Sequence, residues 1–157
     1  MSIPAEGKKA PAFTGTDQNG NKISLPSLKG QKIVLYFYPQ DDTPTCTEQA
    51  CNLRDNFAAL KKEGITVIGI SPDVVAKHKK FETKYQLPFT LLADPEHAII
   101  DKYGVWGEKQ MFGNRYMGLL RTTFLIDEKG IIKKVFLKPK SKQHTAEILN
   151  AWKEIGL

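Results

Sequence analysis

Apolar positions in the first half of the chain group into a strand, a helix and a second strand. The run KIVLYFY, residues 32–38, is rich in β-branched and aromatic residues and predicts a buried strand that Pro39 ends. A helical pattern follows from Thr43 and Pro44 to near Gly64, and the run ITVIGIS then predicts a second buried strand. Strand, helix and strand in this order predict a parallel pair joined by a right-handed crossover.

Shorter strands and helices are predicted on either side of this unit. FTGTDQNGNKISL predicts an N-terminal β-hairpin around Asn19 and Gly20. After the second strand, Ser71, Pro72 and Asp73 are expected to cap a helix that packs on the sheet. Its apolar face is expected to hold Val74, His78, Phe81 and Tyr85. FTLLA is a third strand candidate, and Asp94-Pro95-Glu96 is expected to open a short helix that runs through Tyr103.

The last third of the chain predicts one more hairpin and a closing helix. RTTFLID and IIKKVFL flank the turn DEKG, which favours an antiparallel pair. SKQHTAEILNAWKEIGL is amphipathic, with Ile148, Leu149, Trp152 and Ile155 on its apolar face. The order of elements predicts one domain over residues 1–157 of the α/β class, with a thioredoxin-like fold: a mixed central sheet flanked by helices, with the N-terminal hairpin added.

Composition supports a single domain and argues against several function classes. With 157 residues and 41% hydrophobic content the chain has enough apolar residues for one core, and two cysteines are too few for a disulfide scaffold. The formal charge of +6 is spread along the chain without interleaved aromatic residues, which favours a solvated basic surface over nucleic-acid binding. There is no apolar stretch of membrane-spanning length and no secretory signal, so a cytoplasmic setting is the expectation.

The two cysteines, Cys46 and Cys51, lie five positions apart in one predicted helix. Helix geometry separates Cα atoms at that spacing by about 8.6 Å. A disulfide needs Cα atoms within roughly 4.4 to 6.8 Å of each other. Either the thiols are unrelated, or they meet only when the first turns of the helix unwind.

Cys46 is a candidate nucleophile because of where the pattern places it. It follows a buried strand and lies just inside a helix start, where free N–H groups and the helix dipole favour a thiolate. A small buried apolar residue is an equally good interpretation of the local pattern, because cysteine is among the most buried residue types.

Several motifs around Cys46 resemble one enzyme family. Pro39, Thr43 and Cys46 form a P-x-x-x-T-x-x-C pattern, which resembles the active-site motif of the peroxiredoxins. YFYPQDDTPTCTEQACNLRD, GISPD, KHKKF, LPFTLLADP, YGVWGEK and YMGLLRTTFLID together resemble the bacterioferritin comigratory protein, or peroxiredoxin Q, subgroup, from Phe13 to Asp127. Thr45 stands where that subgroup often has glycine, and Thr122 stands where serine is common.

The resemblance implies a role for each motif residue. Cys46 would be the peroxidatic nucleophile and would become a sulfenic acid. Thr43 would hydrogen-bond the peroxide and the thiolate, Pro39 would shield the thiolate from water, and Arg121 would place a positive charge beside it. On general grounds the same three residues would be a helix cap, a strand terminator and a surface arginine.

The resemblance also implies how the cycle closes. Cys51 would be the resolving cysteine, forming a Cys46–Cys51 disulfide after local unwinding, with thioredoxin or glutaredoxin as the reductant. Hydrogen peroxide and organic hydroperoxides would be the substrates, and no metal, haem or flavin would be needed. The family's members are often monomers, so a monomer is expected.

Other residues of the matched region have less specific interpretations. The resemblance suggests that Glu48 and Arg54 hold hydrogen bonds or ion pairs of the folded site. Alternatively, Glu48 stabilises the helix dipole and Arg54 is solvated. Trp106, Phe112 and Met117 would border the pocket or, as general experience favours, pack in the core.

Three other functions compete with the peroxidase interpretation. A copper-binding module would use the cysteines with His78, His97 or His144, but none shows ligand spacing, and His78 on an apolar helix face is typical of a satisfied core histidine. A protein thiol–disulfide oxidoreductase would prefer a two-residue-spaced cysteine pair. A noncatalytic interaction protein would have no reason to combine Pro39, Thr43, Cys46 and Arg121.

Overall fold

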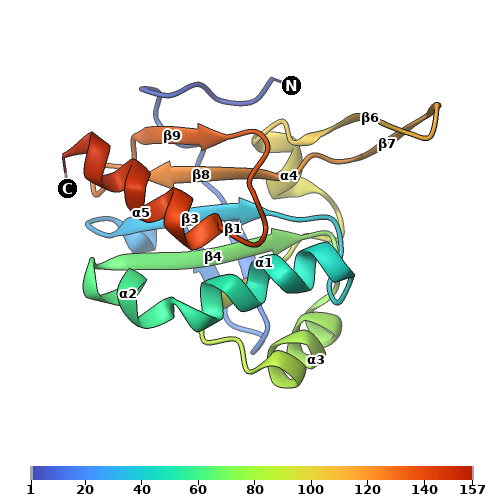
Figure 1. The fold of residues 1–157 in the computed structure, drawn as a ribbon, viewed down its shortest axis with the longest axis horizontal. Coiled ribbons are helices and arrows are strands. Elements are labelled where there is room, and N and C mark those ends of the chain that lie inside the picture. Colours follow the sequence, from blue (N-terminus) through green and yellow to red (C-terminus); the bar gives the residue numbers. More distant parts are fainter. Residues whose placement is uncertain (1, 157) are drawn as a thin grey trace.

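A seven-stranded mixed sheet with helices on both faces forms the centre of the computed structural model, which describes residues 2–156 (Figure 1). The sheet order is β2-β1-β5-β4-β3-β8-β9. Its strands are β1 (Thr14–Asp17), β2 (Lys22–Ser24), β3 (Lys32–Phe37), β4 (Ile65–Ser71), β5 (Thr90–Ala93), β8 (Thr122–Ile126) and β9 (Ile132–Phe136). The helices are η1 (Pro26–Leu28), α1 (Pro44–Asp55), α2 (Phe57–Lys62), α3 (Val75–Tyr85), α4 (Ala98–Lys102) and α5 (His144–Ile155). This architecture confirms the predicted α/β class.

The apolar run of β3 lies at the centre of the sheet because both of its faces are covered. Val34, Tyr36 and Tyr38 face a core that α1, α2, α3 and α5 help to form, whereas Ile33 and Phe37 face a second core with α4. β3 and β4 are parallel, and β3 and β8 are antiparallel. The predicted parallel pair of β3 and β4 and both predicted hairpins are confirmed.

The predicted helix from Thr43 to Gly64 is in fact two helices. α1 ends at Asp55 and α2 begins at Phe57, with Asn56 between them at φ −112° and ψ 16°. The Asn56 side-chain amide donates a 2.8 Å hydrogen bond to the Asn52 carbonyl. Asparagine side chains compete in this way with the helical hydrogen-bond ladder, which explains the interruption.

The start of α3 also differs from the prediction. The residue that precedes the helix is Val74, whose side chain is 53% exposed and makes no cap. The Asp73 carboxylate instead accepts hydrogen bonds from the Ser71 hydroxyl and from the backbone N–H of Asp41, each at 2.7 Å. Within the predicted apolar face, His78 and Phe81 are buried, so only its Val74 end is wrong.

The short α4 begins later than predicted but is capped as expected. It starts at Ala98, and the Asp94 carboxylate accepts hydrogen bonds from the N–H groups of Ile99 and Ile100. In α5 the predicted face is confirmed at Ile148 and Trp152, which are buried. Ile155, in the last turn, is 37% exposed.

A second, two-stranded sheet was not predicted from the sequence. β6 (Trp106–Met111) and β7 (Asn114–Leu119) form an antiparallel hairpin that projects from the body of the molecule (Figure 1). Its two turn residues, Phe112 and Gly113, both have positive φ. Such turns favour Asn-Gly or Gly-Gly, so phenylalanine at the first position obscured the signal.

The hairpin also corrects the prediction for three of its residues. Phe112 is 96% exposed, Met117 58% and Trp106 37%, so core packing, the favoured interpretation, is wrong for them. Trp106 instead packs against the His97 ring, with ring centroids 4.4 Å apart and the two ring planes at 43°. Among residues 2–156, no helix is long and apolar enough to cross a membrane.

Candidate active site

Cys46 lies in the first turn of α1, at the carboxyl end of β3. The chain leaves β3 after Phe37, and Thr43 precedes the helix in an extended conformation, with Pro44 as the first helical residue. The N–H groups of a first turn have no partner within the helix, so they favour a negative charge nearby. Cys46 is 1% exposed and its thiol is free.

Arg121 contacts the Cys46 sulfur directly. Its Nη2 atom lies 3.1 Å from Sγ, and Nη1 lies 3.5 Å from Oε1 of Gln49. The sheet register explains this contact, because Thr122 at the start of β8 pairs with Phe37 at the end of β3. Arg121 therefore enters the site from the strand beside the one that leads to Cys46.

Gln49 is a site residue that the sequence reasoning missed. It lies three positions after Cys46, and residues three or four apart share a helix face. It is 1% exposed, and its Nε2 atom has no hydrogen-bond partner within the part of the chain that the structure describes. Gln49 therefore lies beside the Arg121 guanidinium, with a buried side-chain NH2 group that has no partner among the described residues.

Thr43 and Pro39 lie in the loop before Cys46 and are both half-buried. The Thr43 hydroxyl donates to the Gln40 carbonyl at 3.3 Å. It does not bond a backbone N–H of α1, so the helix-cap interpretation is wrong for its side chain. Its predicted bond to a peroxide, like the shielding predicted for Pro39, stays a prediction.

Tyr36 places a buried hydroxyl in the apolar core that also contains Cys46. Its ring packs against Gly69 so closely that a Cβ atom there would lie 2.9 Å from the Tyr36 Cζ. Its hydroxyl has no partner among the described residues. Burial raises the Tyr36 pKa well above its usual value, and negative charge on Cys46 raises it further. Tyr36 is therefore an uncharged hydroxyl donor in the core that also contains Cys46.

The loop before α1 is fixed by a buried carboxylate, that of Asp41. Oδ1 accepts a 2.6 Å bond from the Tyr38 hydroxyl, and Oδ2 lies 2.6 Å from Nδ1 of His78. Nε2 of His78 donates to the Leu92 carbonyl at 3.0 Å. Asp41 is 2% exposed and His78 is fully buried, so the prediction of a satisfied core histidine is confirmed.

This network bears on the copper alternative. The ligand atoms of Asp41, Asp73 and His78 lie within 4.8 Å of one another, a spacing that a metal ion could use. However, both ring nitrogens of His78 are already engaged, one by Asp41 and the other by the Leu92 carbonyl, so a metal ion would have to displace one of these bonds. His144 is similarly engaged, by Thr123 and Glu147.

Asp42 strengthens the attachment of this loop to α3. It has a positive φ of 61°, and its carboxylate is held at 2.7 Å by both Lys84 and the Tyr85 hydroxyl. The bonds from Lys84 and then Tyr85 hold the pKa of Asp42 below its usual value. The chain entering the Cys46 turn is therefore anchored at Asp41 and Asp42.

A second anchor follows Cys51. The Asn52 side chain donates to the Lys142 carbonyl and accepts from the Thr145 N–H, both at 2.9 Å. Cys51 itself is partly buried, and burial raises the pKa of its thiol. Both thiols are free in the intact helix, and they lie between the two anchors.

Glu48 and Arg54 hold α1 against its neighbours rather than contacting Cys46. Glu48 accepts a 3.2 Å bond from the Ser141 hydroxyl. Arg54 donates to the Tyr85 carbonyl at 2.8 Å and pairs with Asp55 at 2.9 Å. Both residues therefore support the docking of the helix.

The β6–β7 hairpin brings one further charge to the site. Burial lowers the pKa of Lys109 on β6, and Arg121 lowers it further, whereas negative charge on Cys46 raises it. The Lys109 pKa therefore responds to the charges of both residues. Lys109 was not singled out from the sequence, because the hairpin itself was not predicted.

Known proteins resemble this chain over most of its length. The AhpC/TSA family model matches residues 6–135. A provisionally named peroxiredoxin bcp of Coxiella burnetii is 50% identical over 149 residues, covering 95% of this chain and 98% of the relative. Peroxiredoxin Bcp of Escherichia coli is 46% identical over 148 residues, covering 94% and 95%.

A solved structure supports the same similarity. The bacterioferritin comigratory protein of Xanthomonas campestris, described for its alkyl peroxide reduction activity, matches with a TM-score of 0.84. It is 30% identical, and the match covers 90% of each chain. This likeness confirms the predicted thioredoxin-like fold.

Proposed function

Because the chain belongs to the AhpC/TSA family, as a peroxiredoxin of the Bcp and peroxiredoxin Q group, we propose that Cys46 is the residue that reacts with peroxide. Peroxiredoxins are thiol peroxidases, so the class of activity follows from membership. The observation that carries the assignment to Cys46 is its contact with Arg121, 3.1 Å from Sγ to Nη2, at the start of a helix.

The first chemical step is the reaction of the Cys46 sulfur with peroxide, which neighbouring residues assist. The Cys46 thiolate attacks one peroxide oxygen, the O–O bond breaks, and the other oxygen leaves as water or an alcohol after taking a proton. Arg121 stabilises the thiolate and the negative charge that develops on the leaving oxygen. Thr43 would bond the peroxide after its hydroxyl turns from the Gln40 carbonyl, and Pro39 limits access of water.

The second step closes the Cys46–Cys51 disulfide. The Cys51 thiolate attacks the Cys46 sulfenic acid, an S–S bond forms, and the hydroxyl leaves as water. About 8.6 Å between Cα atoms in an intact helix forbids this, so residues 43–51 must unwind first. The anchors at Asp41 and Asn52 support such a limited opening, because they hold the chain on both sides of the thiols.

The cycle also needs a peroxide substrate and a reductant for the disulfide. We propose hydrogen peroxide and organic hydroperoxides as substrates; the alkyl peroxide reduction described for the Xanthomonas campestris protein supports the second class. Thioredoxin, or else glutaredoxin, would reduce the disulfide that unwinding exposes. A monomeric state and a cytoplasmic location stay predictions.

A coupled assay tests the cycle. Peroxide-dependent oxidation of NADPH through thioredoxin reductase and thioredoxin should proceed with the natural chain and stop with Cys51→Ser. That variant should still consume one equivalent of peroxide rapidly, because Cys46 remains. Sustained turnover by Cys51→Ser would contradict the assigned resolution, and insulin reduction without peroxide would instead favour a thiol–disulfide oxidoreductase.

Arg121→Gln should slow the reaction with peroxide about 10- to 100-fold at neutral pH. The change removes a charged donor from Sγ, and hydrogen bonds to charged groups contribute about 1.5–3 kcal/mol. The rate is measured in single turnovers by stopped-flow fluorescence. Arg115→Gln is the matched control, since Arg115 lies on exposed β7 and pairs only loosely with Glu108, at 3.4 Å. Equal rates for the two variants would remove Arg121 from the mechanism.

A further inference from the structure

A pocket of about 300 Å³ lies at the end of the sheet opposite to Cys46. Ile33 at the start of β3 and Ile126 at the end of β8 line it, and these two residues pair across the sheet. Cys46 follows the other end of β3. Residues 33 and 37 of that strand are separated by about 13 Å, at roughly 3.3 Å per residue. The pocket therefore lies outside the peroxide site.

Backbone hydrogen bonds hold the walls of this pocket in place. The N-terminal segment is joined to the β8–β9 turn by the bond from the Ala10 N–H to the Gly130 carbonyl, at 2.9 Å. The segment after η1 is joined to the same turn by the Gly30 N–H and the Glu128 carbonyl, at 3.1 Å. The pocket is thus preformed, as most small-molecule sites are.

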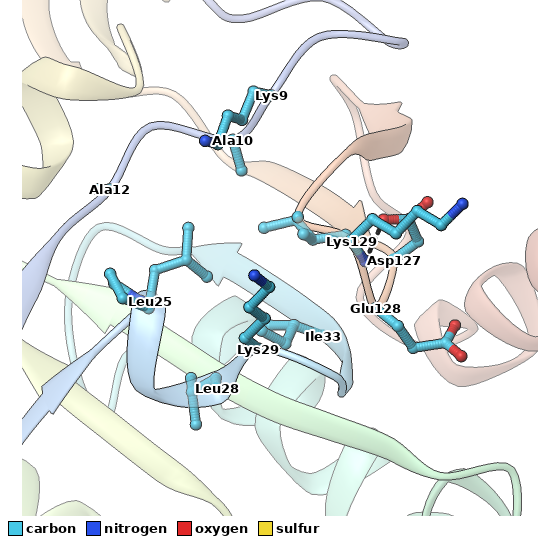
Figure 2. Close-up of a pocket in the computed structure, with 13 residues that line it drawn as sticks. Lys9, Ala10, Ala12, Leu25, Leu28, Lys29, Ile33, Asp127, Glu128 and Lys129 are labelled. Carbon is cyan, nitrogen blue, oxygen red and sulfur yellow. Dashed lines mark hydrogen bonds between the residues drawn. The ribbon is translucent and has the colours of Figure 1, made fainter.

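The pocket combines an apolar interior with positive charge. Its apolar lining includes Ala10, Leu25, Leu28, Ile33 and Ile126. In Figure 2 the Lys29 ammonium group points into the space beside Leu25 and Ile33, and Lys9 lies on the facing wall. Neither lysine has a carboxylate within 4.0 Å among residues 2–156.

The acidic residues of the turn are engaged elsewhere or directed away from the pocket interior. Oδ1 of Asp127 accepts hydrogen bonds from the N–H groups of Lys129 and Ile131, each at 2.9 Å. Its other oxygen lies 3.8 Å from Nζ of Lys133. The side chains of Glu128 and Lys129 extend away from the apolar interior in Figure 2. The charged group that points into the interior is therefore the Lys29 ammonium group.

We propose that this pocket binds a small anion with an apolar chain, in the class of medium-chain carboxylates. The apolar lining would bury the alkyl chain, and Lys29 and Lys9 would pair with the carboxylate. The volume lies at the lower limit for small-molecule sites, which suits a short chain. The proposal is independent of the thiol chemistry, since neither cysteine takes part.

Octanoate is the probe for this proposal. Titrated into isotope-labelled protein, it should cause saturable amide shifts at Ala10, Ile126 and Gly130 in a two-dimensional NMR spectrum, with Cys46 and Cys51 unaffected. It should bind roughly tenfold more tightly than hexanoate, because two further methylenes are buried at about 0.8 kcal/mol each. Octylammonium should bind more weakly than octanoate, because it brings the wrong charge.

Two lysine variants measure how much the ion pair with Lys29 contributes to the octanoate affinity. Lys29→Gln should weaken octanoate binding about fivefold, the scale of an exposed ion pair, and leave octanol binding unchanged. Lys61→Gln on α2 should change neither. Absence of saturable shifts at the three amides, equal binding of octylammonium, or an unchanged octanoate affinity in Lys29→Gln would each overturn the proposal.

Discussion

Cys46→Ser is expected to abolish peroxide-dependent turnover while the chain still folds. A serine hydroxyl is not ionised near neutral pH and is a far weaker nucleophile than a thiolate, so the first step has no reacting group. The side chains are close in size, and the Arg121 donor that now lies 3.1 Å from Sγ can bond the serine oxygen instead. Stability should therefore change little, although the site is 1% exposed.

The measurement combines activity with direct detection of the intermediate. NADPH oxidation in the thioredoxin-coupled assay should equal the enzyme-free rate, and mass spectrometry after peroxide treatment should find no sulfenic acid at residue 46. Cys51→Ser is the matched control, because it alters the other thiol of the same helix and should yield the Cys46 sulfenic acid. Turnover by Cys46→Ser above the enzyme-free rate would overturn the assignment.

His78→Ala should lower the free energy of unfolding by about 3–5 kcal/mol. The change leaves the Asp41 carboxylate buried without its charged or proton-sharing partner, and the loss of one partner of a buried pair has this magnitude. It also removes the donor to the Leu92 carbonyl. Urea unfolding followed by circular dichroism measures the change in stability.

A double-mutant cycle and one control variant distinguish pairing of Asp41 with His78 from simple loss of side-chain volume. In a double-mutant cycle, Asp41→Ala with His78→Ala should cost less than the sum of the single changes, since the double variant leaves no buried charge unpaired. Thr123→Ala tests a neutral buried hydrogen bond, that to His144 at 2.9 Å, and should cost about 1–3 kcal/mol. Additive effects at Asp41 and His78 would show that they act separately.

The parts of the fold that the sequence predicted are those with a clear hydrophobic period. β3 and β4 are continuous apolar runs, and Asn19 and Gly20 form a strong turn signal, so each was found from local residues alone. The break at Asn56 was missed because the helical pattern continues through it. The β6–β7 hairpin was missed because Phe112 occupies a turn position that normally selects glycine or asparagine.

The site was predictable only where a motif lies close together in the sequence. Cys46, Cys51 and Thr43 fall within one segment, whereas the contact of Arg121 with Cys46 joins residues 75 positions apart and depends on the pairing of β3 with β8. The bond between Asp41 and His78 spans 37 positions. No local pattern reveals such a pair, and only the family resemblance pointed to Arg121.

The break at Asn56 has a consequence for the speed of the proposed cycle. It separates α1 from α2, so the opening of residues 43–51 need not reach α2, which can stay folded on β4. Helices of about this size form and melt within about a microsecond, whereas typical enzymes complete roughly 1 to 1,000 cycles per second. The melting of α1 itself is then too fast to set the pace. Another step must therefore set the pace: the reaction with peroxide, the release of the contacts that residues 43–51 make in the folded site, or the arrival of the reductant.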